Sequence, residues 1–108
     1  MWCYNRLVIL SSRKRLENYV CSQIKNKLVC RAFKKVDRKL FVPKRWAEHA
    51  YVDNAIPLGG DSSISQPSLV AQMIDLLDLT GKEHVLEIGT ASGYSAAILS
   101  LCCKNVDT

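Results

Sequence analysis

Several marks of familiar protein classes are missing from this 108-residue sequence. The apolar run Leu-Val-Ile-Leu at residues 7–10 is too short for a membrane span or for the apolar core of a secretion signal, so no membrane association is expected. No Cys-x-x-Cys pair occurs, and both histidines lie far from the cysteines, so no metal site is indicated. There is no repeat or low-complexity tract, and an apolar content of 48% is typical of one folded domain.

The cysteine pattern does not indicate a disulfide framework. The chain has five cysteines, an odd number, with Cys21 and Cys30 nine residues apart and Cys102 next to Cys103. We therefore expect buried, reduced thiols in a reducing, cytoplasmic compartment. The first sixteen residues have no acid and contain Arg and Ser, which leaves an organelle transit peptide as an alternative.

Acidic residues are scarce in the first part of the chain. Residues 1–45 hold thirteen of the fifteen Lys and Arg residues but only two acids, Glu17 and Asp37. Such a charge pattern is found on the solvated faces of helices that pack against an acidic partner half, and also on surfaces that bind nucleic acid. The first interpretation is favoured, and nucleic acid is not the expected partner.

Apolar periodicity predicts helices in the N-terminal half. Between residues 12 and 28 apolar side chains recur every three or four positions, which indicates a surface helix, and a second helix follows over 29–36 after a break near 25–27. Pro43 ends any helix there, and residues 46–51 form a short helical turn. Turn-forming residues fill 53–66, which predicts a long loop, and loops of this length are usually functional.

A second set of elements follows that loop. Pro67 is a good first residue for a helix whose apolar face comprises Leu69, Val70, Met73, Ile74 and Leu77 and which stops at Gly81. A strand over 84–88, a helix over 94–103 and the start of a second strand at 105 complete the chain.

The stretch Val-Leu-Glu-Ile-Gly-Thr-Ala-Ser-Gly at 85–93 indicates a strand, a tight turn and a helix start. Ligands of parallel sheets bind beyond the carboxyl ends of the strands, where Glu87 would suit a cationic ligand group and Gly89 would let the backbone turn. The dinucleotide pattern G-x-G-x-x-G is absent because Ala91 stands at its second glycine, and no phosphate-loop Gly-Lys-Ser/Thr occurs. A packing turn without a ligand remains the alternative.

The glycine turn and three upstream stretches together carry a resemblance. Residues 87–94 are similar to the first motif of class I methyltransferases. Three upstream stretches accompany it: Ala-Phe, Val-Asp-Arg and Phe-Val-Pro within 32–43, Tyr-Val-Asp-Asn-Ala-Ile-Pro-Leu-Gly at 51–59, and Ser-Ile-Ser-Gln-Pro at 63–67. The order and spacing of all four resemble the protein-L-isoaspartate O-methyltransferase family over roughly residues 15–106.

The resemblance implies an α/β fold, a truncated Rossmann-like methyltransferase fold in which N-terminal helices precede the first βα unit of a parallel sheet. Residues 1–108 would be a single partial domain with an N-terminal helical segment (12–51), an active-site loop (52–67) and the first part of the cofactor-binding core (68–108). The implied activity is methyl transfer from S-adenosyl-L-methionine to the free carboxylate of L-isoaspartyl residues in damaged proteins. Two alternatives are a non-catalytic remnant that binds nucleic acid or a protein through its basic helices, and another small-acceptor methyltransferase.

The resemblance also implies site residues. Ser65 matches the family's active-site serine, although capping of the helix that begins at Pro67 would equally explain it from the residues alone. Asp53 and the Gly59-Gly60 turn would shape the substrate opening or serve only the turn. The positions matched to cofactor binding are Ser62, Ser63, Ile64, Glu87, Gly89, Thr90, Ala91, Ser92 and Gly93.

Some positions depart from the family pattern. Ala91 replaces a glycine and adds a methyl group where the backbone approaches the cofactor, and Asp61 also stands at a usual glycine. An acidic residue that binds the ribose hydroxyls, about twenty positions after Gly89, would fall just past Thr108. One complete strand cannot form a parallel sheet, so we expect this chain to be poorly stable alone and without independent activity.

Overall fold

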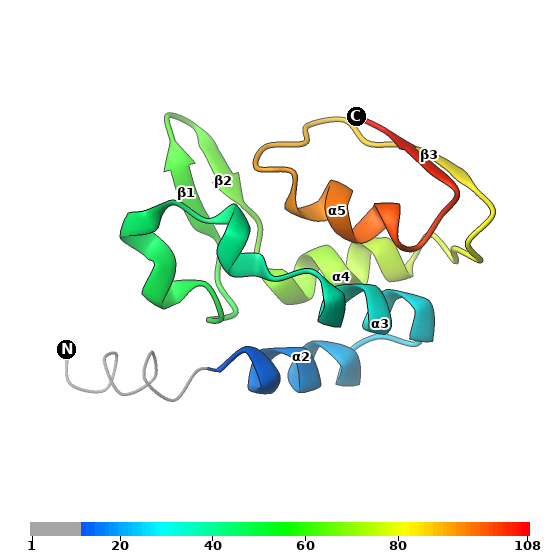
Figure 1. Cartoon of the computed structure of the whole chain (residues 1–108), viewed down its shortest axis with the longest axis horizontal. Helices are drawn as coiled ribbons and strands as arrows, with labels where there is room; N and C mark the ends of the chain where they lie inside the picture. The colour runs from blue at the N-terminus through cyan, green and yellow to red at the C-terminus, as the bar shows by residue number, and fades with distance from the viewer. Residues whose placement is uncertain (1–11) are drawn as a thin grey trace.

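The computed structural model describes residues 12–108 (Figure 1). Residues 7–10 and most of the segment read as a possible transit peptide lie outside that range. In chain order the elements are α2 (Arg13–Ser22), α3 (Lys27–Lys35), the 3-10 helices η1 (Arg38–Phe41) and η2 (Lys44–His49), β1 (Ile56–Gly59), β2 (Ser62–Ile64), α4 (Pro67–Asp75), β3 (His84–Leu86), α5 (Tyr94–Ser100) and β4 (Asn105–Asp107).

The helices form a layered core beneath the strands. In Figure 1, α2 lies lowest and α3, α4 and α5 lie above it. The β3–β4 pair lies above α5, at the upper right of the view. The apolar faces that periodicity predicted on α2 and α3 are the ones that enter this core. Its buried members are Leu16, Val20, Val29, Ala32, Phe33, Ile64, Val70, Ala71, Ile74, Leu79, Tyr94, Ile98, Leu99, Cys102 and Cys103.

The last strand, β4, pairs with β3. β3 and β4 lie parallel, with His84 opposite Asn105 and Leu86 opposite Asp107. The backbone N–H of Glu87 donates to the carbonyl of Asp107 at 2.8 Å, which extends the ladder by one bond. The expectation of a single unpaired strand is therefore wrong, because α5 ends at Ser100 and leaves enough chain to return beside β3.

The long loop predicted over 53–66 contains regular structure. β1 and β2 form an antiparallel hairpin in which Ile56 pairs with Ile64, and both side chains are buried. Gly59 and Gly60 have φ of +113° and +57°, the left-handed region that glycine favours at a hairpin tip. The turn formers in this stretch thus mark a hairpin tip and its two ends rather than an irregular loop.

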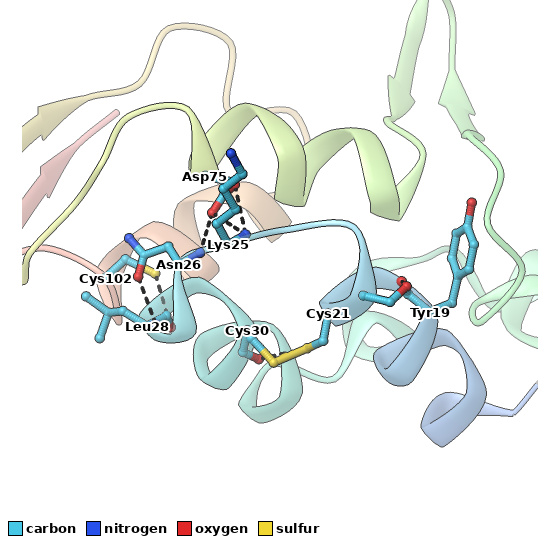
Figure 2. Close-up of a disulfide and its surroundings, with 9 residues drawn as sticks. Tyr19, Cys21, Lys25, Asn26, Leu28, Cys30, Asp75 and Cys102 are labelled. Carbon is cyan, nitrogen blue, oxygen red and sulfur yellow. Dashed lines mark hydrogen bonds between the residues drawn. A yellow bond between two sulfur atoms is a disulfide. The ribbon is translucent and has the colours of Figure 1, made fainter.

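A disulfide joins Cys21 on α2 to Cys30 on α3, with Cα atoms 5.2 Å apart (Figure 2). The expectation of reduced thiols at these positions is wrong, because the contact depends on how the two helices fold back on each other and not on their spacing in sequence. Cys102 and Cys103 are free and buried, and burial raises the pKa of Cys102 to about 11.

The turn between α2 and α3 is fastened to α4 (Figure 2). The Asp75 carboxylate accepts hydrogen bonds from the backbone N–H groups of Lys25 and Asn26, the latter at 2.8 Å. The Asn26 side chain caps α3 by accepting from Leu28 N–H and donates to the Leu79 carbonyl. Four backbone polar groups at helix ends are satisfied in this way, which fixes α4 against the N-terminal helices.

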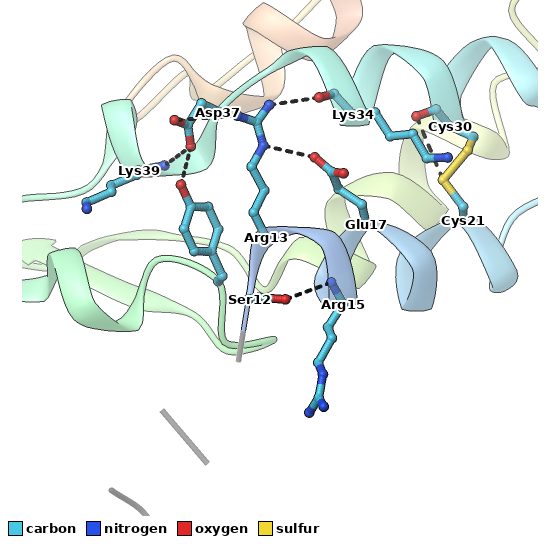
Figure 3. Close-up of polar contacts among 10 residues, drawn as sticks. Ser12, Arg13, Arg15, Glu17, Cys21, Cys30, Lys34, Asp37 and Lys39 are labelled. Carbon is cyan, nitrogen blue, oxygen red and sulfur yellow. Dashed lines mark hydrogen bonds and ion pairs between the residues drawn. A yellow bond between two sulfur atoms is a disulfide. The ribbon is translucent and has the colours of Figure 1, made fainter. Parts of the chain in front are cut away.

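Part of the basic N-terminal segment is paired internally (Figure 3). Arg13 contacts Glu17 at 2.9 Å and Asp37 at 3.6 Å, and it donates to the Lys34 carbonyl. Burial alone would raise the pKa of Asp37, but hydrogen bonds from Tyr51 and the Lys39 backbone and the charge of Arg13 outweigh it, so that pKa lies below its usual value.

One side of α4 and β3 leaves large apolar side chains exposed. Of the five residues expected on the buried face of the 67–81 helix, Val70 and Ile74 are buried, whereas Leu69, Met73 and Leu77 are exposed. Exposed Leu86 and Ile88 continue the apolar surface onto the end of β3. Among residues 12–108, no helix has the length and apolar character needed to cross a membrane.

Candidate functional site

Ser65 lies between the end of β2 and the start of α4, and its side chain is exposed. Within the described part of the chain its hydroxyl makes no hydrogen bond, and the N-cap position of α4 is Gln66. The carboxylate of Asp53 accepts instead from Ser68 N–H at 2.8 Å, from the Ser68 hydroxyl at 2.7 Å and from the Gln66 side-chain amide at 3.0 Å. The capping alternative for Ser65 is therefore wrong: Asp53 satisfies the helix start, and the Ser65 hydroxyl is available to a ligand.

The glycine turn after β3 is left-handed at three alternate positions. Gly89, Ala91 and Gly93 have φ of +84°, +49° and +87°. The Gly93 N–H donates to the Thr90 carbonyl at 2.8 Å, which closes the turn just before α5 begins at Tyr94. Ala91 thus occupies a conformation that costs an L-residue about 1 to 2 kcal/mol relative to the right-handed one, which is why glycine suits this position better.

Two hollows meet where the serine loop approaches this turn. The larger, of about 310 Å³, lies between α4, the end of β3 and α5, with Ser65, Glu87, Gly89 and Ser95 among its lining and Met73 and Leu77 on its apolar wall. The smaller, of about 80 Å³, lies between the loop and the turn and is lined in part by Ser63, Ile64, Ser65, Gly89, Thr90, Ala91 and Ser92. Ser65 and Gly89 line both, so the two predicted segments share one site.

The structure thereby brings together most of the residues matched to the site. Ser62 and Gly93 do not line either hollow: Ser62 is exposed at the start of β2, and Gly93 serves as the left-handed residue that begins α5. Ser92 lies on the smaller hollow, and its hydroxyl also accepts from Tyr94 N–H at 3.4 Å.

Glu87 presents a carboxylate to the larger hollow. One oxygen, Oε2, accepts a hydrogen bond from the Ser95 hydroxyl. The other, Oε1, is buried and has no hydrogen-bond partner among residues 12–108. A buried acceptor of this kind is stable only when a donor reaches it, so the position suits a ligand group that carries N–H donors and positive charge. The described residues contain no cluster of three or more His, Cys, Asp or Glu side chains that could hold a metal.

Comparison with known proteins identifies the family. The protein-L-isoaspartate(D-aspartate) O-methyltransferase family matches residues 12–107. The chain belongs to this family. It is 53% identical over 85 residues to protein-L-isoaspartate O-methyltransferase 2 of Shewanella sediminis, a match that covers 79% of this chain and 35% of that protein. It is 48% identical over 99 residues to the protein-L-isoaspartate O-methyltransferase of Trichlorobacter lovleyi, covering 90% of this chain and 46% of that one.

A solved structure titled protein-L-isoaspartate O-methyltransferase shares the fold. It superposes with a TM-score of 0.76 at 28% sequence identity and covers 89% of this chain but 33% of the solved one. These findings confirm the resemblance inferred from the motifs, the α/β fold class and the assignment to a methyltransferase family. The chain spans less than half the length of these relatives.

Sequence analysis missed the residues that hold the Ser65 loop and the Glu87 carboxylate in place. Arg38 is 2% exposed, and its Nη2 donates to the carbonyls of Ser65 at 3.0 Å and of Asn54 at 3.2 Å. Burial lowers the pKa of Arg38, while Tyr94 and Asp53 oppose that shift. Arg38 stands in one of the stretches that carry the resemblance, but sequence analysis gave it no role, because as one of many cations in residues 1–45 it shows no sign of being buried. Ser95 was missed because its contact with Glu87 spans the glycine turn.

Proposed function

We propose that this chain supplies the methyl-donor turn and the acceptor loop for methyl transfer from S-adenosyl-L-methionine to the free carboxylate of L-isoaspartyl residues in proteins. The observation that supports this most directly is the position of Ser65. Ser65, whose hydroxyl has no hydrogen-bond partner in the described structure, lines the same two hollows as Gly89, so that an acceptor held by the loop and a donor held by the turn would meet.

The residues at the turn fit the cofactor. The methionine end of S-adenosyl-L-methionine carries an ammonium group, and Glu87, whose carboxylate has one oxygen without a partner among residues 12–108, lines the larger hollow. Gly89 turns the backbone beside both hollows, and Ala91 does so beside the smaller one. When bound, the cofactor supplies the electrophilic methyl group.

The acceptor chemistry asks little of the protein beyond orientation. A carboxylate is already ionised at neutral pH, so no general base is needed to generate the nucleophile. A hydroxyl at Ser65 can donate a hydrogen bond to one carboxylate oxygen without neutralising it, which leaves the other oxygen free to attack.

The test is methyl transfer to paired peptides. The 108-residue chain, and the same chain extended by the C-terminal remainder of the Trichlorobacter lovleyi relative, are incubated with labelled S-adenosyl-L-methionine and a peptide containing either L-isoaspartate or L-aspartate at one position. We expect label on the isoaspartyl peptide only, and only with the extended chain. Equal labelling of both peptides, or none with either protein form, would refute the proposal.

A matched pair of serine variants locates the acceptor site. Ser65→Ala is expected to lower kcat/KM for the isoaspartyl peptide by about tenfold to a hundredfold while donor binding is kept, because one orienting hydrogen bond is lost. Ser100→Ala is the control, since Ser100 lies on α5 away from both hollows and its hydroxyl donates only to the Ala97 carbonyl. Equal activity of the two variants would remove Ser65 from the site.

A further inference from the structure

Arg38 is a buried cation at a position where an apolar residue would avoid the free-energy cost of removing a charge from water. Its side chain is almost completely buried, under the hairpin and against α5, and it has no carboxylate partner among residues 12–108. Removing a guanidinium from water costs several kcal/mol unless its environment compensates. Its Nε and Nη1 have no hydrogen-bond partner in the described structure, so only Nη2 and the face of the group make specific contacts.

The Nη2 contacts close the base of the hairpin. Asn54 lies just before β1 and Ser65 just after β2, and Nη2 donates to the carbonyls of both. One group of a buried residue therefore ties together the two ends of the hairpin. The tie includes the backbone of Ser65, which lines both hollows.

The face of the same guanidinium contacts the other half of the site. Its central carbon lies 4.9 Å from the centre of the Tyr94 ring, a cation–π arrangement. Tyr94 is the first residue of α5, directly after the glycine turn, and it lines the smaller hollow. Phe33 and Phe41 pack edge-on against the Tyr94 ring, which holds that ring in place. Arg38 thus touches both the serine loop and the start of the helix after the turn.

We propose that Arg38 is a positioning residue for methyl transfer: by joining the Ser65 backbone to Tyr94 it sets the separation between the acceptor loop and the donor turn. This inference rests on the proposed function for its catalytic meaning, but the positioning itself is a property of the free chain. Lysine would keep the charge yet lacks the flat group that stacks on Tyr94 while donating at its edge.

Amide hydrogen exchange on the 108-residue chain tests the positioning without any ligand. The hydrogen-bonded amides directly after the serine loop are those of Ser68, which donates to Asp53, and Val70, which donates to the Gln66 carbonyl. Arg38→Met is expected to speed exchange at these two amides by about tenfold more than it speeds exchange across α2 and α3, since the two ends of the hairpin lose their shared donor. Val20→Ala, a buried change on α2 remote from the hairpin, is the control for general destabilisation. Arg38→Lys should restore part of the protection. If Arg38→Met and Val20→Ala speed exchange uniformly to the same extent, the proposal is overturned.

Kinetics of the extended chain then separate positioning from folding. Arg38→Met should lower kcat/KM for the isoaspartyl peptide by about tenfold or more while the KM for S-adenosyl-L-methionine changes by less than about twofold. A fall in kcat alone that matches the fraction of folded protein would show a merely structural role and overturn the proposal. If the unaltered protein transfers no methyl group, the proposed function fails, and the exchange measurement still decides whether Arg38 positions Ser65.

Discussion

Replacing Asp53 should destabilise the start of α4 more than any other single surface carboxylate near the site. The Asp53 carboxylate accepts three hydrogen bonds, two from Ser68 and one from Gln66, and α4 has no side-chain cap of its own at Gln66. In Asp53→Ala the first turn of α4 loses its acceptor, and the Ser68 hydroxyl, in a buried residue, loses its partner.

The magnitude follows from the separate contacts. The bond from Ser68 N–H is equivalent to an N-cap, typically worth about 1 kcal/mol. The bonds from the Ser68 hydroxyl and the Gln66 amide, made to a half-buried carboxylate, add about 0.5 to 1 kcal/mol each. Asp53→Ala should therefore lower the free energy of unfolding by about 2 to 3 kcal/mol, and Asp53→Asn, which keeps one oxygen acceptor but no charge, by about half of that.

Urea unfolding followed by circular dichroism measures these differences. Asp61→Ala is the control: Asp61 is an exposed acid at the hairpin tip, has no side-chain hydrogen bond in the described structure, and should change stability by less than about 0.5 kcal/mol. If Asp53→Ala costs no more than Asp61→Ala, then Asp53 does not hold α4, and the reasoning that frees the Ser65 hydroxyl from capping fails with it.

The remaining predictions concern the disulfide, the turn and one tyrosine. The double variant Cys21→Ala, Cys30→Ala should lose about 2.6 kcal/mol of unfolding free energy by the loop-entropy relation for a nine-residue separation; urea unfolding with and without dithiothreitol checks this, and a reductant effect that persists in the double variant would contradict it. Ala91→Gly should stabilise the chain by up to about 1 kcal/mol by relieving its positive φ, measured as a rise in thermal midpoint; a fall would mean that the turn gains nothing from glycine. Burial, with the hydrogen bond to Asp37, raises the pKa of Tyr51 to about 12, so its contribution to stability is complete below pH 10 and is lost as pH rises through 12. Unfolding followed across that interval should show this loss in the unaltered chain and a smaller one in Tyr51→Phe.

The helix ends and the glycine turn could be predicted from the sequence because they depend on residues close together in the chain. Apolar spacing gave the break between the first two helices near residues 25–27, where Asn26 caps α3. Pro67 begins α4 because an N–H at the first helical position would have no helical partner, so the lack of one in proline costs nothing there. The glycine turn was predicted from Gly89 and Gly93, and both have the left-handed φ that only glycine adopts at low cost.

Contacts between elements could not be predicted in the same way. Cys21 and Cys30 meet because α2 and α3 fold back on each other, and no spacing rule supplies that angle. Arg38 reaches carbonyls 16 and 27 residues further along the chain, a contact that exists only once the hairpin has formed. The hairpin itself was missed because its strands are three and four residues long, too short for alternation to stand out among turn formers.

Within residues 12–108 the Ser65 hydroxyl has no partner in an ordered loop because other side chains hold the backbone around it. Backbone polar groups that leave water need partners, and the β1–β2 ladder provides them only between Ile56 and Ile64. At the two ends of the hairpin Arg38 provides donors to the carbonyls, and Asp53 provides an acceptor for the start of α4. The groups flanking Ser65 are therefore held by charged side chains, while its own hydroxyl is not. Because the backbone on either side of Ser65 is held, orienting a carboxylate would order only the Ser65 side chain, and this keeps low the entropy cost of the proposed methyl transfer to an already ionised acceptor.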